Sequence, residues 1–198
     1  MGKIIKFATT LYVDHIVFTA WGCTMTIPEQ MFLCNSLITL ELKGCDFSPI
    51  DLRFPTVRTL HLEHCGIHFR DEECSSGRVD FSQGCPKLIA LSLVECIFIG
   101  KPEGSDNVGK IIGFATTVDH IVLTAYRCTI PKQMFSCKSL ITLELKCCLL
   151  SPNDLRFPTV RTLLLDNCSF DFHDENCSSG CLDFSQGCPK LIALSLVE

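Results

Sequence analysis

The chain has 198 residues, of which 47% are hydrophobic and 20% are charged, a balance that excludes a disordered tail. Its 17 Lys and Arg stand against 22 Asp and Glu, and the net charge of −5 argues against a dedicated nucleic-acid binder or a protein that binds anionic membranes. The 15 cysteines are the unusual feature of the composition.

The first 20 residues begin like a weak secretory signal, with two lysines before an apolar stretch. Asp14 and His15 interrupt that stretch, and the segment recurs at 109–125. A cleavable signal has an unbroken apolar region and no reason to recur inside a chain, so we interpret both copies as folded structure. Because no run of about 18 apolar residues is present, we expect no transmembrane helix. The sequence predicts a cytoplasmic or nuclear protein with reduced thiols.

A nine-residue pattern, L-x-x-L-x-L-x-x-C, follows and recurs along the chain. Its alternating apolar residues predict a short strand with one buried face. Recurrence every 20–30 residues or so is typical of a leucine-rich-repeat solenoid. Aligning the patterns makes Phe18 the equivalent of Leu40. The pattern occupies 37–45, 57–65, 88–96, 140–148, 160–168 and 191–198, with degraded versions at 15–23 and 120–128.

These strands predict an α/β fold, a leucine-rich-repeat solenoid with a parallel β-sheet of about eight short strands. We expect an irregular convex side of loops and short helices. The Cys that closes each pattern falls at a corner, where a small buried side chain can satisfy backbone groups. This register and a second one, three residues before the pattern, explain most of the cysteines without disulfides or metal. The cysteines in register are Cys23, Cys34, Cys45, Cys65, Cys85, Cys96, Cys128, Cys137, Cys148, Cys168 and Cys188.

The chain is also internally duplicated. Residues 27–95 align with 130–198 without a gap, and about three quarters of the positions are identical. We therefore divide the chain into a first leucine-rich block at 1–105 and a second at 109–198, which is truncated at its C-terminus. The linker at 96–108 contains the Gly, Pro, Ser, Asp and Asn that mark a loop. We expect the two blocks to form one continuous solenoid.

Three phrases of this sequence resemble the leucine-rich repeats of plant F-box proteins. They are IPEQMFLCNSLITLELKGC with its copy IPKQMFSCKSLITLELKCC, then FPTVRTLHLEHC, and then GCPKLIALSLVEC. The resemblance implies a non-enzymatic protein-interaction module that recognises the substrate of a Skp–cullin–F-box ubiquitin ligase. In that family an N-terminal F-box docks the Skp-type adaptor. We find no F-box pattern here, so an adaptor is expected only if an F-box lies elsewhere in the gene product. The alternative is a free-standing or remnant repeat protein with no ligase role.

Other chemistry is less well supported by the sequence. His61, His64 and His68 form a run of possible metal ligands, but the second copy lacks all three and no C-x-x-C is present. Cys147 and Cys148 are adjacent, but Cys147 replaces Gly44 of the first copy, which suggests drift and not a reactive thiol. Hydrolase and nucleotide motifs are absent from the sequence. We expect no enzyme activity, no cofactor and no metal.

Strand positions that point away from the buried leucines are predicted to line the concave face and contact a protein substrate of unknown identity. Late in the first strand of each copy this position is aromatic, and aromatic side chains are frequent anchors at interfaces. We expect neither nucleic acid nor a membrane as a partner. The predicted partner-binding residues are Trp21, Glu41, Lys43, His61, Glu63, Tyr126, Glu144, Lys146, Leu164 and Asp166.

Overall fold

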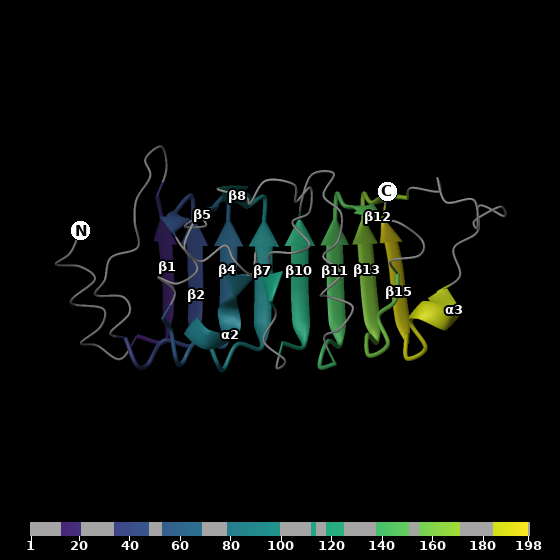
Figure 1. The fold of residues 1–198 in the computed structure, drawn as a ribbon, viewed down its shortest axis with the longest axis horizontal. Helices are drawn as coiled ribbons and strands as arrows, with labels where there is room; N and C mark the ends of the chain where they lie inside the picture. Colours follow the sequence, from purple (N-terminus) through teal and green to yellow (C-terminus); the bar gives the residue numbers. More distant parts are fainter. Residues whose placement is uncertain are drawn as a thin grey trace.

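The computed structural model describes residues 13–20, 34–47, 53–68, 79–99, 112–113, 118–124, 138–150, 155–170 and 184–197. Eight five-residue strands lie side by side in one parallel sheet and follow one another in chain order (Figure 1). The predicted sheet of about eight short parallel strands is confirmed. The strands are β1 (His15–Thr19), β2 (Thr39–Lys43), β4 (Thr59–Glu63), β7 (Ala90–Val94), β10 (His120–Thr124), β11 (Thr142–Lys146), β13 (Thr162–Asp166) and β15 (Ala193–Val197).

The sheet continues from the first copy of the duplication into the second. β7 pairs with β4 on one side and with β10 on the other, both in parallel. The core leucines therefore stack across the whole sheet, one layer from each strand. Leu40 pairs with Leu60, Leu60 with Leu91, and Leu91 with Ile121. Burial of a side chain of this size is worth about 1.5–3 kcal/mol, so these stacked layers are a principal source of stability.

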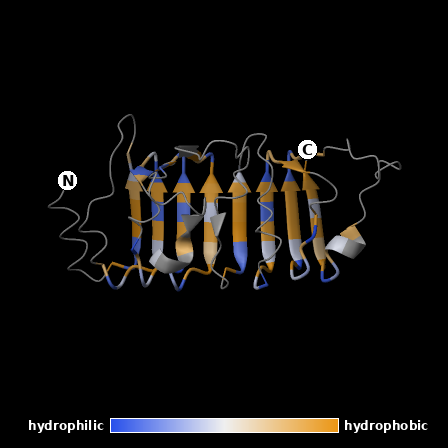
Figure 2. Ribbon diagram, viewed as in Figure 1, coloured by the Kyte–Doolittle hydropathy of each residue, from blue (hydrophilic) through white to orange (hydrophobic). Residues whose placement is uncertain are grey.

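Buried and half-buried positions alternate along the strands. The pattern is strict in β2, β4, β7, β10 and β11, where the second and fourth residues are buried. Figure 2 shows the same alternation as hydrophobic and hydrophilic segments along the strands. This period of two is the geometry of a pleated strand with one face on a core. It leaves a complete second face of the sheet available to solvent.

The predicted alignment of the first strand of each copy with the next strand is wrong by two residues. Ile16 pairs with Leu40, while Phe18 pairs with Leu42, and β10 shows the same shift against β11. A shift of two leaves every side chain on the same face, so a period of two cannot detect it. The predicted late strand position of Trp21 is a consequence of that alignment. β1 ends at Thr19 and β10 at Thr124, and Trp21 and Tyr126 lie outside the described residues.

A second row of short parallel strands, divided into two small sheets, follows the corner after five of the main strands, and the sequence analysis did not predict it. One member, β8, lies within the segment 96–108, so the prediction of a loop there is wrong for these residues. Its sequence Ile-Phe-Ile favours a strand, and it pairs with β5. The row consists of β3 (Asp46–Phe47), β5 (Gly66–His68), β8 (Ile97–Ile99), β12 (Leu149–Leu150) and β14 (Ser169–Phe170). A further pair joins β6 (Val79–Asp80) to β9 (Ile112–Gly113).

Five of the main strands, β2, β4, β7, β11 and β13, are each joined to the corner that follows by a residue with positive φ. Gly44 has φ of 64°, and four residues other than glycine share the conformation at equivalent points. L-residues adopt this left-handed region at a cost, so its recurrence shows that the coil geometry demands it. The other four are His64, Glu95, Cys147 and Asn167.

Two short helices, α2 (Phe81–Gly84) and α3 (Phe184–Gly187), have the same sequence, FSQG, and precede the last strand of each copy. Phe81 is buried, and its carbonyl accepts a hydrogen bond from the Cys85 N–H at 2.7 Å. The Cys85 carbonyl then accepts from the Leu88 N–H at 3.0 Å, which leads the chain into β7. This explains the Cys-Pro-x-Leu phrase as a structural turn. In the described ranges no helix is long and apolar enough to span a membrane.

Candidate partner-binding face

The solvent side of the eight-stranded sheet, which we call the strand face, carries the half-buried residues of the strands. Eight of the ten predicted partner-binding residues lie on it, and Trp21 and Tyr126 fall outside the described residues. The eight are Glu41, Lys43, His61, Glu63, Glu144, Lys146, Leu164 and Asp166, each in a main strand at a half-buried position. The sequence therefore predicted correctly that these eight side chains lie on the solvent side of the sheet, and their contact with a partner stays a prediction.

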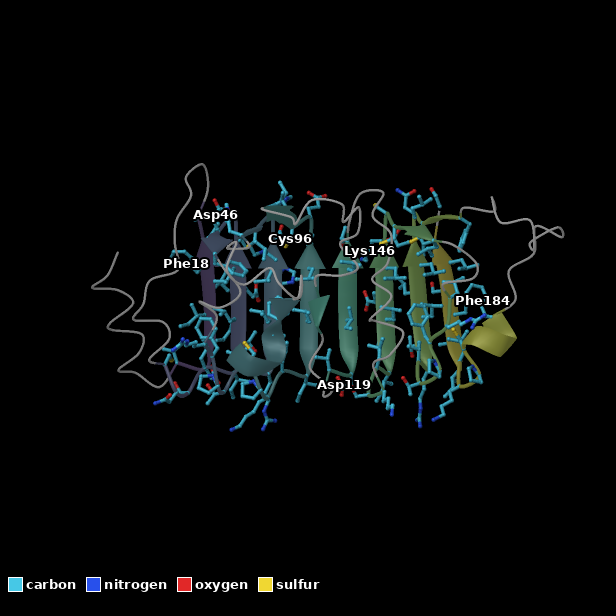
Figure 3. All side chains as sticks on the ribbon, viewed as in Figure 1. Phe18, Asp46, Cys96, Asp119, Lys146 and Phe184 are labelled. Carbon is cyan, nitrogen blue, oxygen red and sulfur yellow. The ribbon has the colours of Figure 1, made fainter. Side chains whose placement is uncertain are left out.

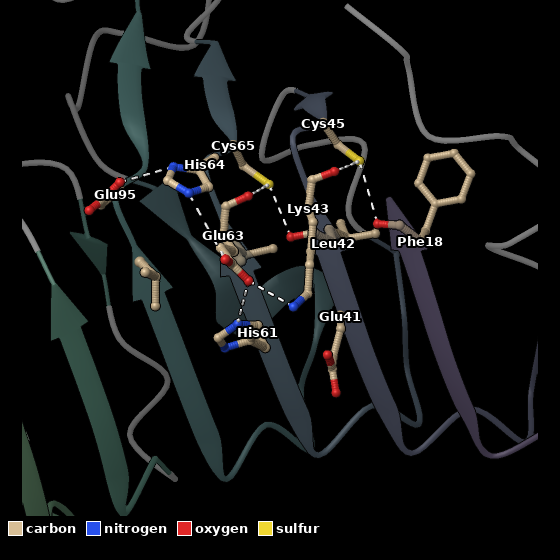
Figure 4. Close-up of polar contacts among 12 residues, drawn as sticks. Phe18, Glu41, Leu42, Lys43, Cys45, His61, Glu63, His64, Cys65 and Glu95 are labelled. Carbon is tan, nitrogen blue, oxygen red and sulfur yellow. Dashed lines mark hydrogen bonds and ion pairs between the residues drawn. The ribbon is translucent and has the colours of Figure 1, made fainter. Parts of the chain in front are cut away.

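Glu63 is the centre of a cluster of charged side chains in the first copy (Figure 4). Its carboxylate lies 2.8 Å from Lys43 Nζ and 3.6 Å from His61 Nε2. His64, in the turn after β4, lies 3.1 Å from the Glu95 carboxylate. Because neighbouring parallel strands put equivalent residues side by side, opposite charges one strand apart meet without any bend in the chain. The cluster fixes the direction in which these polar groups point.

The Lys43–Glu63 pair is formed at neutral pH. The hydrogen bond with Lys43 lowers the pKa of Glu63, and the same contact raises the pKa of Lys43. A carboxylate with a lowered pKa stabilises the fold above its unfolded pKa and loses that contribution as pH falls through the folded value. A lysine with a raised pKa contributes below its unfolded pKa and loses the contribution as pH rises through the folded value. Both side chains are well hydrated, so the pair matters for the charge pattern more than for stability.

The second copy repeats this arrangement in a looser form. Lys146 Nζ lies 3.8 Å from the Asp166 carboxylate, and His120 Nε2 lies 3.7 Å from the Glu144 carboxylate. Figure 3 places Lys146 toward the end of β11. Asp166 replaces the longer Glu63 and Leu164 replaces His61. The two halves of the strand face therefore differ in their polar groups and in the length of the side chains that carry them.

A shallow hollow lies in the middle of the strand face, over β7. It arises because the outward residues of β7 are Ala90 and Ser92, which are small, while the flanking strands carry larger side chains. The sequence analysis missed this hollow and missed His120 as one of its walls. The small outward residues of the pattern at 88–96 were the available signal in the sequence. The hollow is lined by Glu41, Thr59, His61, Ala90, Leu91, Ser92, His120 and Val122.

Metal ligation finds no support in the side-chain arrangement. His61 and His64 both lie beside Glu63, and His68 Nε2 lies 3.7 Å from Asp46. Across the described ranges no group of three or more His, Cys, Asp or Glu is placed to hold a metal ion. The three histidines instead contact carboxylates, His61 and His64 that of Glu63 and His68 that of Asp46.

The comparisons with known proteins point to one kind of protein. No family model matches the sequence. A putative F-box/FBD/LRR-repeat protein of Arabidopsis thaliana is 32% identical over 89 residues, a segment that covers 44% of this chain and 20% of that relative. Among solved structures, internalin C2 of Listeria monocytogenes has the same fold, with a TM-score of 0.50 and 12% identity over 98% of this chain and 91% of the internalin. The chain has the leucine-rich-repeat fold. Its resemblance to plant F-box leucine-rich-repeat proteins, inferred from short phrases, is confirmed.

The leucine-rich-repeat fold and this relative support a protein-interaction module. The matched segment spans only a fifth of the relative, so the comparison concerns the repeats and not the whole protein.

The cysteines of the leucine-rich repeats have a structural role at the corner of the coil. The Cys65 thiol lies 3.3 Å from the Leu42 carbonyl of the preceding strand and 3.4 Å from the Glu63 carbonyl of its own strand (Figure 4). Cys96, Cys148 and Cys168 make the same two kinds of contact. Each thiol can donate to one of these carbonyls, which adds a side-chain hydrogen bond to the backbone bonds of the corner. The prediction that the corner cysteines satisfy backbone groups is confirmed for these described residues.

The second cysteine register lies at the start of the pattern and is buried as well. In the first copy Ser36, two residues after Cys34, donates a 2.9 Å hydrogen bond to the Val13 carbonyl, and Ser139 donates to the Val118 carbonyl at 2.7 Å. The Cys-x-Ser phrase thus ties the second coil of each copy to the first. All nine cysteines in the described residues are free thiols.

We expect the buried thiols of Cys85 and Cys188 to react slowly with alkylating reagents. Burial raises the pKa of Cys85 to about 11, and burial also raises the pKa of Cys188. Cys147 is half-buried at a turn. Since the thiolate is the nucleophile, Cys85 should label at least about tenfold more slowly than Cys147 in the native chain at neutral pH. Time-resolved iodoacetamide labelling with peptide mass spectrometry measures both rates, and labelling in urea should bring them together. A buried thiol that labels faster than Cys147 would favour a thiol-dependent activity.

Proposed function

We propose that the strand face recognises a protein substrate as the leucine-rich-repeat part of an F-box subunit of a Skp–cullin–F-box ubiquitin ligase. The observation that carries this proposal is the match between these repeats and the Arabidopsis F-box/FBD/LRR-repeat protein. The role is one of binding, and the ligase chemistry belongs to other subunits. The Skp-type adaptor is part of the proposal only where the gene product contains an F-box.

The strand face has two features that a partner could recognise, a cluster of polar side chains and a shallow hollow. Glu63 with its neighbours Lys43 and His61 presents fixed polar groups next to the hollow over β7. Interfaces gain most of their affinity from a few anchors in such depressions, while surrounding polar groups choose the partner. We infer that a side chain of the substrate enters the hollow over Ala90 and Ser92. The flanking carboxylates and bases then select a segment with complementary charges.

We place this function in the cytoplasm or the nucleus. Nine free cysteines in the described residues suit a reducing compartment. The net charge of −5 gives no electrostatic reason for nucleic acid or an anionic membrane to be the partner.

A charge-swapped variant tests the role of the strand face. Glu41→Lys together with Lys43→Glu keeps the net charge. It removes the carboxylate that His15 contacts and places a second carboxylate beside Glu63 in place of the Lys43 ammonium. Proteins captured by the tagged gene product are compared by quantitative mass spectrometry with those captured by the variant. The control is Lys87→Glu, in the exposed turn before β7. We expect the substrate to be lost at least about tenfold with the swapped pair and retained with the control.

Two further readouts separate the ligase role from plain binding. The gene product should co-purify with the Skp-type adaptor, and ubiquitin conjugates of the captured substrate should fall with the charge-swapped variant. A face-dependent partner without adaptor or ubiquitin conjugates would instead indicate a free-standing repeat protein. If the charge-swapped variant captures the same proteins as the wild type, the partner uses another surface.

A further inference from the structure

The residues that immediately precede the main strands form a continuous row along one edge of the sheet. Backbone hydrogen bonds join each member to the next. The Arg58 N–H donates to the Ile38 carbonyl at 2.8 Å, and the Ile89 N–H donates to the Arg58 carbonyl at 2.8 Å. The same bonds continue through the join between the two copies. We call this row the entry rim, and from β2 to β13 it consists of Ile38, Arg58, Ile89, Asp119, Ile141 and Arg161.

Isoleucine alternates with a charged residue along the entry rim, and the isoleucines face solvent. Ile38, Ile89 and Ile141 are 45%, 37% and 43% exposed, whereas Leu40, two residues after Ile38, is completely buried. Single exposed apolar residues are common on protein surfaces, but here they recur at every second coil of a row that the backbone holds in place. Since neighbouring parallel strands lie about 4.8 Å apart, the isoleucines repeat about every 10 Å.

The edge of the sheet that carries the entry rim is basic, although the chain as a whole has a net charge of −5. Asp119 is the only acidic residue in the described turns at 34–38, 53–58, 84–89, 118–119, 138–141 and 155–161, and Asp14, before β1, is a second carboxylate at one end. Figure 3 shows nitrogen atoms at the tips of side chains along this edge, where Asp119 is labelled. The bases of these turns are exposed and form no ion pair with another described residue, and they are Arg53, Arg58, Lys87, Lys138, Arg156 and Arg161.

The carboxylates on the strands have partners of their own. Glu41 lies 3.1 Å from His15, and Glu63 lies 2.8 Å from Lys43. Guanidinium groups bind carboxylates through paired hydrogen bonds, and they favour an anion with that planar geometry. The arginines of the entry rim are therefore available to carboxylates of another molecule, next to apolar side chains that are also exposed.

We propose that the entry rim binds an acidic segment of a partner protein in which an apolar side chain recurs about every third residue. In the extended polyproline II conformation three residues advance about 9.3 Å, which matches the spacing of the isoleucines. The apolar side chains of the segment pack on Ile38, Ile89 and Ile141. Its carboxylates pair with Arg58 and Arg161. The isoleucines favour such a peptide over a nucleic acid, whose phosphates are bound by bases and polar groups.

This surface is separate from the strand face, and the inference does not rest on the function proposed for that face. The test is fluorescence anisotropy of the complete chain with a labelled peptide of repeating Leu-Asp-Glu. We expect saturable binding that weakens as salt is raised, because the charged pairs are open to solvent. Arg58→Glu should weaken binding at least about fivefold, and Ile89→Ser at least about threefold. Asp119→Asn should tighten it about twofold, because it removes a carboxylate that repels the peptide.

Lys146→Glu is the matched control, because it makes a comparable charge change at the far end of β11. A strand of five residues is about 13 Å long, and salt screens exposed charges over about 8 Å at physiological ionic strength. This variant should therefore bind the peptide like the wild type. Lys87→Glu distinguishes the two surfaces, since it should weaken the peptide at least about twofold and yet retain the substrate of the strand face.

A peptide of repeating Ser-Asp-Glu keeps the carboxylates and removes the apolar side chains, so it should bind at least about threefold more weakly. Equal binding of the two peptides overturns the proposal, and so does the absence of saturable binding to the Leu-Asp-Glu peptide. A single-stranded oligonucleotide that binds more tightly than this peptide, with no effect of Ile89→Ser, would indicate a nucleic-acid surface and would also overturn it. Ile141→Ser replaces Ile89→Ser if circular dichroism shows that the latter fails to fold.

Discussion

Leu163→Ala is expected to lower the free energy of unfolding by about 3 kcal/mol, while Leu164→Ala, the next residue, lowers it by less than about 1 kcal/mol. Leu163 is fully buried in β13 and pairs with Leu143, so truncation removes packed methyl groups and leaves a cavity. Leu164 lies on the strand face, half in solvent. The two substitutions are chemically identical, so the difference between them directly reports which face of the sheet each residue lies on.

Urea unfolding followed by circular dichroism measures both variants. The slope of the transition should stay that of the wild type, so that the shift in midpoint reports stability alone. Equal losses in the two variants would contradict the assignment of faces in β13. Leu62→Ala and His61→Ala in β4 should differ in the same way, because Leu62 is buried and His61 lies on the strand face.

The main sheet could be predicted because its signal is local. Apolar and polar residues alternate within each strand, and this alternation requires only that one face of the strand is buried. Thr39–Lys43 illustrates this, since Leu40 and Leu42 are completely buried between half-buried neighbours. The cysteine count was explained for a similar reason. Cys45 and Cys65 recur at a fixed distance after their strands, so spacing alone indicated a corner position.

The features that sequence reasoning missed depend on contacts between coils. The register of β1 differs from its prediction by two residues, and only its pairing with β2 distinguishes the alternatives. β3 and β5 are two or three residues long and exist because equivalent residues of successive coils meet. A segment such as Asp46–Phe47 carries no periodicity of its own. Non-local pairing of this kind leaves no mark in a single stretch of sequence.

The candidate site was predicted in outline but not in detail. Outward strand positions identified the strand face, and Glu41, Lys43, His61 and Glu63 lie there as expected. The hollow over β7 depends on the contrast between neighbouring strands, which the order of strands in the sheet determines. His120 reaches the hollow only because β10, from the second copy, pairs with β7. The join between copies thus creates the centre of the face.

Gly44→Ala is expected to lower the free energy of unfolding by at least about 2 kcal/mol, because two separate costs add. Gly44 has φ of 64°, a conformation that an L-residue adopts at a cost. A Cβ built at Gly44 would also lie 2.1 Å from the Ala20 carbonyl oxygen. That oxygen belongs to backbone at the end of β1, so relief would require β1 and β2 to separate. Chemical denaturation of the variant measures the loss.

Cys147→Gly is the matched substitution in the second copy, and it should raise the free energy of unfolding by up to about 1 kcal/mol. Cys147 occupies the equivalent turn with φ of 55° and already accommodates a side chain there. Only the backbone cost applies at this position, and glycine removes it. Opposite signs at two equivalent positions would show that the turn itself prefers glycine and that the contact with Ala20 makes glycine necessary at Gly44. A Gly44→Ala variant as stable as the wild type would contradict the close approach of β1 to this turn.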